Sequence, residues 1–192
     1  MLHQKVSEQL KQFTRQNHQQ LEKMLVAQLR SLSSTEEYVK LLQLFYSYFG
    51  GLEDKINQYI GADLLSDYSQ RRKTESLVSD IKKLGGTINA KAKDHSLPKI
   101  ENVLHAFGAL YVIEGSTLGG KVISQMIAKK LNIENAAGMT FFNGYGDDTE
   151  LMWASFRELL NSQFKNQSDI DVIISSADDT FFNFKLWIER NA

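Results

Sequence analysis

The chain has 192 residues, a length that suits one domain better than two. It contains no cysteine, which excludes disulfides, thiolate metal sites, iron–sulfur clusters and a cysteine nucleophile. Lys plus Arg number 22 and Asp plus Glu number 23, so the net charge of −1 argues against a protein that binds nucleic acid by neutralising phosphates. We therefore expect residues 1–192 to form a single domain with no nucleic-acid partner.

The hydropathy pattern contains no membrane signal. No apolar run approaches the ~20 residues that are needed to cross a bilayer. Residues 1–20 are polar and charged and contain no hydrophobic signal segment. The sequence predicts a cytoplasmic protein with no membrane partner.

The apolar residues of the first half mostly recur with the period of a helix. A second helix is expected to begin at Ser34, where Glu37 completes a capping box, and to run towards Gly61. A third helix is expected over residues 67–84. The first segment carries one apolar stripe, made of Leu10, Phe13, Leu21, Leu25 and Leu29.

The second half begins with a polar loop over residues 87–97. Pro98 suits the first turn of a helix, because its missing N–H is not needed there. The helical pattern then runs over residues 99–131, and a second loop covers 132–146. The pattern of this helix is interrupted by three glycines: Gly115, Gly119 and Gly120.

The last part of the chain predicts two more helical regions. Asp147 or Asp148 can cap a helix over residues 149–165, and Ser168 with Asp171 is a possible capping box for a helix that ends near residue 188. The β-branched run 172–174 lies inside this helical pattern. The fold class is therefore expected to be all-α, with six or seven helices in one compact bundle.

His18 is the histidine whose neighbours suggest chemistry. Glu22 is one helical turn further on, so its carboxylate can accept a hydrogen bond from the imidazole. A metal-bound histidine usually donates its second N–H to such a partner. The alternative is a partly buried histidine that makes an ordinary contact with Glu22. The residues that share the helix face of His18 are Lys11, Thr14, Leu21 and Glu22.

The glycines at 115, 119 and 120 are the second unusual feature. Each glycine inside a helix costs about 1 kcal/mol relative to alanine. Close approach of a flat ligand would explain them, because glycine has no Cβ. Close packing against another helix is the alternative, although it does not by itself predict the adjacent pair Gly119-Gly120.

Together, these segments resemble the heme oxygenase family, in its soluble bacterial form. Lys11-x-x-Thr14-x-x-x-His18-x-x-x-Glu22 resembles the proximal helix of that family. The segment Tyr111–Gly120 resembles its glycine-rich distal helix, which is kinked. A looser match is Phe141-Phe142 followed by Phe156-Arg157.

The resemblance implies roles for particular residues. His18 matches the axial ligand of the heme iron, and Glu22 matches the carboxylate that orients it. Gly115 and Gly119 match glycines that lie against the porphyrin. With them, Glu114 and Ser116 are expected to form the catalytic part of the distal pocket. The further residues expected to contact heme are Lys11 and Arg157 at the propionates, Thr14, Tyr46, Tyr111, Gly120, and Phe141 or Phe142.

The implied activity is oxidative cleavage of heme by O2 to biliverdin, CO and ferrous iron, with heme as both substrate and cofactor. Ser116 stands where animal enzymes carry an aspartate that anchors the catalytic water. This difference leaves Glu114, Ser116 or the backbone to organise that water. The sequence contains no nucleotide-binding glycine motif. We therefore expect electrons from a ferredoxin or a flavin reductase, docked near Lys11, Arg15 or Arg157.

A second interpretation is a heme-binding protein of the same fold that stores, delivers or senses heme without cleaving it. Such a protein would keep His18 but would not need the distal glycines, so the glycines favour the enzyme. Thiaminase-like relatives require a cysteine, and ferritin-like di-iron sites require paired Glu-x-x-His motifs. The sequence has neither feature.

Overall fold

The computed structural model describes residues 4–133 and 137–191 of the chain. Within these ranges the regular structure consists of α-helices and short 3₁₀ helices, with no strand, which confirms the all-α class. None of the described helices is long and apolar enough to span a bilayer.

The first helical segment divides at Thr14 into α1 (Val6–Phe13) and α2 (Arg15–Ser31). The Thr14 hydroxyl donates to the carbonyl oxygen of Leu10 at 2.8 Å, a side-chain bond of the kind that competes with regular helix hydrogen bonding. The expectation of one continuous apolar stripe is therefore wrong, and Phe13 is 59% exposed.

The second helix, α3 (Thr35–Ile56), begins as expected: Oγ of Ser34 accepts a hydrogen bond from the Glu37 N–H at 3.2 Å. The Glu37 carboxylate, however, accepts from the N–H of Ser33 rather than from that of Ser34. The helix ends at Ile56, before Gly61.

The expected third helix is shorter than residues 67–84. A 3₁₀ helix, η1 (Tyr68–Gln70), precedes α4 (Glu75–Lys83). Between the two elements, the side chains of Arg71 and Arg72 reach Glu114 and the Ile113 carbonyl oxygen.

The glycine-containing segment forms three successive elements: α5 (Val103–Gly115), the 3₁₀ helix η3 (Ser116–Gly119) and α6 (Gly120–Leu131). Asn102 caps α5 by accepting from the N–H of His105 at 2.9 Å. The start expected at Pro98 is therefore wrong, because the side-chain cap lies four residues later. The short 3₁₀ helix η2 (Asp94–Ser96) lies in the preceding loop.

The expected second loop, residues 132–146, contains α7 (Thr140–Asn143) and ends where η5 (Gly146–Asp148) begins, while residues 134–136 lie outside the described ranges. Next come α8 (Thr149–Gln163) and α9 (Gln167–Asn191). The capping box at Ser168 is wrong, because Oδ1 of Asn166 accepts from the Ser168 N–H at 3.1 Å and caps α9. The run 172–174 is helical, as expected.

The expected number of six or seven helices is too small, since the described residues form α1 to α9. The division at Thr14 and the four-residue α7 account for the difference.

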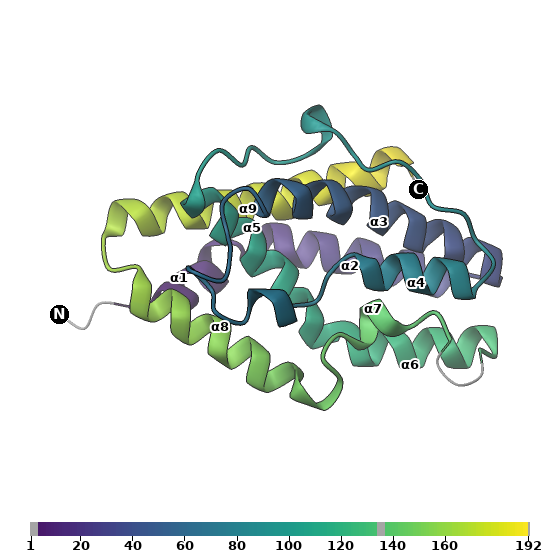
Figure 1. The fold of residues 1–192 in the computed structure, drawn as a ribbon. Coiled ribbons are helices and arrows are strands. Elements are labelled where there is room, and N and C mark those ends of the chain that lie inside the picture. Colours follow the sequence, from purple (N-terminus) through teal and green to yellow (C-terminus); the bar gives the residue numbers. More distant parts are fainter. Residues whose placement is uncertain (1–3, 134–136, 192) are drawn as a thin grey trace.

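The helix α9 organises the packing. It packs against α1, α2, α3 and α5. Figure 1 shows α9 and α3 along one side of the molecule, α5 near the middle, and α6, α7 and α8 on the other side. The backbones of α5 and α9 approach so closely that a Cβ on Gly108 would lie 2.5 Å from the Ile173 carbonyl oxygen.

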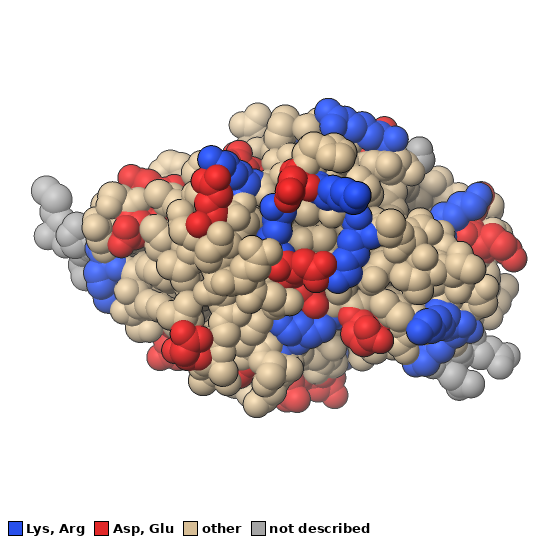
Figure 2. Space-filling view, turned by 45° about the horizontal axis from the view of Figure 1, so that its top comes forward, with Lys and Arg blue, Asp and Glu red and all other residues tan. Residues whose placement is uncertain are grey.

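The loop before α5 is pinned across α3. The N–H of Ala92 donates to the Ser47 carbonyl oxygen at 2.8 Å, and Nζ of Lys91 contacts Asp54 at 2.7 Å. Figure 2 shows acidic and basic side chains interspersed over one face of the molecule, in keeping with the net charge of −1.

Candidate functional site

His18 lies on α2 with an exposed side chain. Its ring centroid is 5.1 Å from that of Phe181, which is a buried residue of α9. The imidazole therefore lies against the surface of α9, where α2 packs on that helix. Two hydrogen bonds reinforce this packing beside the ring: Asn17 Nδ2 to Asp178 Oδ2 at 2.9 Å, and Lys185 Nζ to Gln20 Oε1 at 2.8 Å.

The other residues of the expected proximal motif differ in exposure. Glu22 and Lys11 are exposed, whereas Thr14 is buried and its hydroxyl donates to the Leu10 carbonyl oxygen in α1. Among the described residues, no hydrogen bond joins Glu22 to His18. The orienting role of Glu22 therefore stays a prediction.

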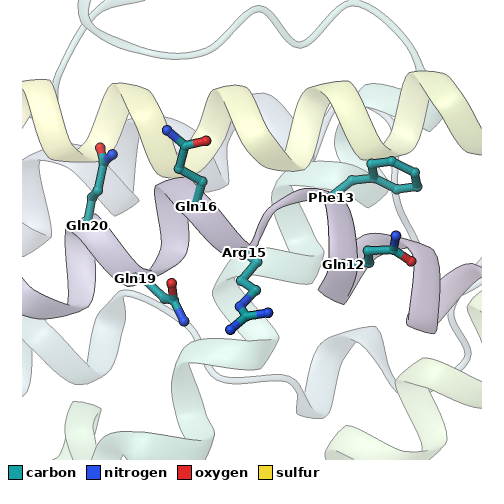
Figure 3. Close-up of a pocket in the computed structure, with 6 residues that line it drawn as sticks. All are labelled: Gln12, Phe13, Arg15, Gln16, Gln19 and Gln20. Atoms are coloured by element: carbon teal, nitrogen blue, oxygen red, sulfur yellow. The ribbon is translucent and has the colours of Figure 1, made fainter.

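A surface pocket of about 520 Å³ lies along α1 and α2. Figure 3 shows Gln16 and Gln20 directed towards α9, with Arg15 and Gln19 directed to the other side of α2. Its polar lining includes no metal ligand, and His18 is not part of it. Sequence reasoning named only Arg15 here, because glutamines carry no signal of metal binding or nucleophilic chemistry. The pocket is lined by Gln12, Phe13, Arg15, Gln16, Gln19 and Gln20.

The distal glycines have different surroundings. A Cβ on Gly119 would meet only Ile123 Cδ1, at 4.0 Å, and a Cβ on Gly115 would have Trp153 as its nearest neighbour, at 3.6 Å. A Cβ on Gly120, by contrast, would lie 1.7 Å from the carbonyl oxygen of Phe142. Backbone packing therefore explains Gly120, while space beside Gly119 fits the ligand-facing interpretation.

Two exposed apolar side chains lie close to Gly119 in the sequence, with the exposed Lys121 between them. Leu118 is 41% exposed and Val122 is 70% exposed. These side chains are available to contact a ligand. At the carboxyl end of α6, Nζ of Lys130 donates to the carbonyl oxygen of Arg30. This bond joins the last turns of α6 and α2.

Trp153 of α8 contacts three of the residues that were expected at the site. Its ring centroid is 5.4 Å from that of Tyr111, the Arg157 guanidinium lies 5.7 Å from its centroid, and Gly115 faces its ring edge. Burial raises the pKa of Tyr111 to about 12, and the charge of Arg157 opposes this shift. Sequence reasoning missed Trp153, although its spacing of four residues from Arg157 could have indicated the contact.

Lys11 and Arg157 lie near the junction of α1 and α8. The N–H of Ser7 donates to Oδ1 of Asn161 at 3.0 Å and joins the two helices. Lys11 is one turn beyond Ser7 and Arg157 is one turn before Asn161, and a turn spans about 5.4 Å. Both cations are exposed, so a ligand at this junction can reach them.

The side chain of Glu114 is enclosed by protein, since only 1% of the residue is exposed. Its carboxylate accepts from Nη1 of Arg71 at 2.8 Å and from the Tyr145 hydroxyl at 2.9 Å. Burial raises the pKa of Tyr145, and the nearby Glu114 carboxylate adds to this effect.

The Ser116 side chain is also bonded within the protein. Its hydroxyl donates to the Ile113 carbonyl oxygen at 2.7 Å and accepts from Nη2 of Arg72 at 2.6 Å. Sequence reasoning missed Arg71 and Arg72, whose only signal is an arginine pair after a turn.

The expected aromatic residues belong to the core. The Arg72 guanidinium lies over the ring of Phe141, with Cζ 4.1 Å from the ring centroid. Phe142 makes an edge contact with Phe45 at 5.6 Å between centroids. Tyr46, on α3, is partly buried and packs at the edge of the same core. Their roles in heme contact stay predictions.

Comparisons with known proteins identify the family. A family model described as heme oxygenase matches residues 4–190. The chain is 25% identical, over 157 residues, to a heme oxygenase of Xanthomonas campestris pv. campestris (strain 8004), with 82% of this chain and 92% of that protein covered.

Solved structures share the fold. Heme oxygenase from Neisseria meningitidis, studied in NO- and CO-bound forms, has a TM-score of 0.83 at 21% identity, with 97% of this chain and 92% of that chain covered. Heme oxygenase-2 from Synechocystis sp. PCC 6803, in complex with heme and NO, has a TM-score of 0.76 at 17% identity, with 97% and 84% covered. Family and fold together support heme binding and heme degradation at the family level. The chain belongs to the heme oxygenase family.

Proposed function

We propose that this protein is a heme oxygenase that cleaves heme with O2 to biliverdin, CO and ferrous iron. The observation that carries the proposal is the exposed glycine surface at Gly119, in a chain that also presents His18 on α2. Heme is the substrate, held between the helix of His18 and the segment Gly115–Gly120.

The imidazole of His18 is our assigned iron ligand. A porphyrin supplies its iron with four nitrogen ligands, so one neutral imidazole from the protein suffices. Phe181 packs beside the ring and would limit its rotation when the imidazole binds iron. Glu22, one turn away, is assigned to hold the other N–H when heme is bound.

The distal surface suits the opposite face of the porphyrin. Gly115 and Gly119 let the backbone approach the ring, while Leu118 and Val122 supply apolar contact. Burial of such surface contributes roughly 25 cal/mol per Å². Close backbone approach would also restrict the size of the molecules that can bind beside the distal segment.

The propionates are assigned to the two exposed cations at the junction of α1 and α8. Arg157 can pair with a carboxylate through two parallel hydrogen bonds, and its contact with Trp153 limits its motion. Lys11 supplies a second, more flexible charge. These contacts would set the rotation of the ring in its plane and so determine which edge meets the distal segment.

Bound heme supplies the redox chemistry, and the protein contributes orientation and a restricted pocket. Glu114 and Ser116 already use their polar groups within the protein. We therefore assign the ordering of distal water to backbone carbonyl groups of α5 and η3. Electrons come from a separate donor, for which a ferredoxin and a flavin reductase are the candidates.

The test is a titration of the purified protein with hemin, followed by reduction. We expect a Soret band that saturates at one equivalent, and biliverdin absorbance once ascorbate, or ferredoxin with its reductase, is added under air. His18→Ala should lose the imidazole-ligated spectrum. His95→Ala is the matched control, because His95 lies in the exposed loop over α3.

Each result has a clear meaning. Absence of hemin binding would overturn the proposal. Hemin binding without ring opening would instead select a protein that stores, delivers or senses heme. An unchanged spectrum in His18→Ala would refute the ligand assignment alone.

A further inference from the structure

Two adjacent arginines in the segment between η1 and α4 reach the point where α5 becomes η3. Arg71 and Arg72 lie 41 to 44 residues before the atoms that they bind in this segment. Neither side chain belongs to the expected proximal or distal motif. Their contacts tie a separate part of the chain to the glycine-containing segment.

Arg71 anchors the last turn of α5. Its side chain is 1% exposed and donates to Glu114, and it also pairs with Asp67 at 2.6 Å. The same guanidinium donates to the carbonyl oxygen of Met152 and to the Ser155 hydroxyl, both in α8. Arg71 therefore fixes Glu114, and through it the end of α5, relative to α8.

Arg72 acts one residue further along, at the start of η3. Its Nη2 donates to the carbonyl oxygen of Ile113 at 2.8 Å and to Oγ of Ser116 at 2.6 Å. Its Nη1 donates to the Phe141 carbonyl oxygen at 3.2 Å. A positive charge at the carboxyl end of a helix also interacts favourably with the helix dipole.

Tyr145 closes the arrangement. Its hydroxyl donates to the Glu114 carboxylate and accepts from the backbone N–H of Arg72 at 2.8 Å. Arg71, Glu114, Tyr145 and Arg72 therefore hold one another, and the backbone between Ile113 and Ser116 cannot shift without breaking several charge-assisted bonds.

We propose that Arg72, supported by the Arg71–Glu114–Tyr145 contacts, is a positioning residue that fixes the backbone of Gly115–Gly120 through Ile113 and Ser116. In this arrangement Ser116 transmits the constraint and is not a proton donor, because its hydroxyl proton is directed at the Ile113 carbonyl oxygen. The catalytic consequence rests on the proposed heme oxygenase function, whereas the backbone constraint does not.

The planar guanidinium is required for this role. It binds a carbonyl oxygen, a hydroxyl and a second carbonyl oxygen from one rigid group, which the single ammonium of lysine cannot reproduce. We therefore expect Arg72→Met to loosen Gly115–Gly120 strongly, and Arg72→Lys to do so partly. Lys73→Met is the matched control, since Lys73 stacks on Tyr68, with Nζ 3.3 Å from the ring centroid.

Amide hydrogen exchange of the hemin-free protein tests the constraint directly. Hydrogen bonds to charged groups stabilise local structure, and we expect the amides of 115–120 to exchange about ten-fold faster in Arg72→Met. Amides of α3 serve as the internal reference. Ser116→Ala should produce a smaller increase, and adding it to Arg72→Met should change little more.

The hemin-bound protein tests the consequence for the site. We expect Arg72→Met to bind hemin with nearly unchanged affinity. In the ferric, hemin-bound protein, the pH at which the Soret band changes should differ from that of the wild type. The kcat for heme cleavage should be reduced. If Arg72→Met does not fold, Arg72→Lys and Ser116→Ala are used for the exchange experiment.

Unchanged exchange at 115–120 in the folded variants, or an equal effect of Lys73→Met, would overturn the proposal. Failure of the wild-type protein to bind hemin would overturn the proposed function, while the exchange result would still stand.

Discussion

At the scale of single residues, Gly119 and Gly120 make opposite predictions although they are neighbours. In Gly119→Ala the new Cβ would contact only Ile123, and the backbone at this position has right-handed helical angles that alanine adopts easily. We expect stability to rise by about 0.5–1 kcal/mol, because alanine makes the unfolded chain less flexible. Gly120→Ala forces a Cβ into the Phe142 carbonyl oxygen, and we expect a loss of about 1–3 kcal/mol. Urea unfolding of both variants measures the difference. Equal stabilities would contradict the described packing.

The buried pair of Arg71 and Glu114 makes a second prediction at this scale. Removal of one partner leaves the other charge buried, so Arg71→Met should lower the free energy of unfolding by about 3–5 kcal/mol. The double variant Arg71→Met/Glu114→Gln should recover part of this loss, because Glu114 then carries no buried charge, although Asp67 has still lost its partner. Urea titrations of the single and double variants provide the measurement. A double variant less stable than Arg71→Met would argue against a direct pairing.

At the scale of elements, the short helix α7 depends on a side chain from α4. Asp80 is fully buried and accepts from the N–H groups of Thr140 at 3.0 Å and Phe141 at 2.8 Å. We expect Asp80→Ala to cost about 1–2 kcal/mol, since it removes the cap of α7, and Asp80→Asn to cost less. The comparison is Ser34→Ala, which removes the more exposed cap of α3. If Asp80→Ala were as stable as the wild type, α7 would not depend on this cap.

The periodic elements were predictable from the sequence, and the element ends were less so. The sequence predicted α3, α8 and α9 because their apolar residues follow the helical period over many turns. The helix starts predicted at Pro98 and Ser168 are wrong. The side chains that cap α5 and α9 are those of Asn102 and Asn166. Asparagine is also a favoured capping residue, and these two lie four residues after Pro98 and two residues before Ser168.

The sequence names candidate site residues only where a local motif exists, and the roles of these residues stay predictions. His18 and the distal glycines stand out by spacing and by residue type. The contacts of Arg71 and Arg72 with Ile113, Glu114 and Ser116 could not be foreseen, since these partners lie more than 40 residues away and follow no periodic pattern. Likewise, only the folded chain separates Gly119, which has space beside it, from Gly120, which packs against backbone.

At the scale of the whole molecule, buried tyrosines make stability depend on alkaline pH. Burial raises the pKa values of Tyr38 and Tyr48 far above their ordinary value of about 10, while the unfolded chain keeps that value. The folded state therefore holds protons that the unfolded state releases above pH ~10, so stability should fall as pH rises through that region.

Urea unfolding at a series of pH values between 7 and 11 measures this fall. Tyr48→Phe should show a shallower decline above pH ~10, because one of the retained protons is removed. The hydroxyl of Tyr48 makes only a 3.3 Å bond to the Thr180 carbonyl oxygen, which makes phenylalanine a mild replacement. An identical decline in Tyr48→Phe would mean that other groups control the alkaline transition.

The packing of α9 also has a consequence for the order in which the molecule is assembled during translation. This helix is synthesised after α1, α2, α3 and α5, yet it contacts all four and holds the ring of His18 through Phe181. The earlier helices can form locally as they leave the ribosome, but their shared partner arrives only with residues 167–191. We therefore expect a nascent chain stalled before α9 to remain sensitive to protease, and the imidazole to reach its final position only once α9 has emerged.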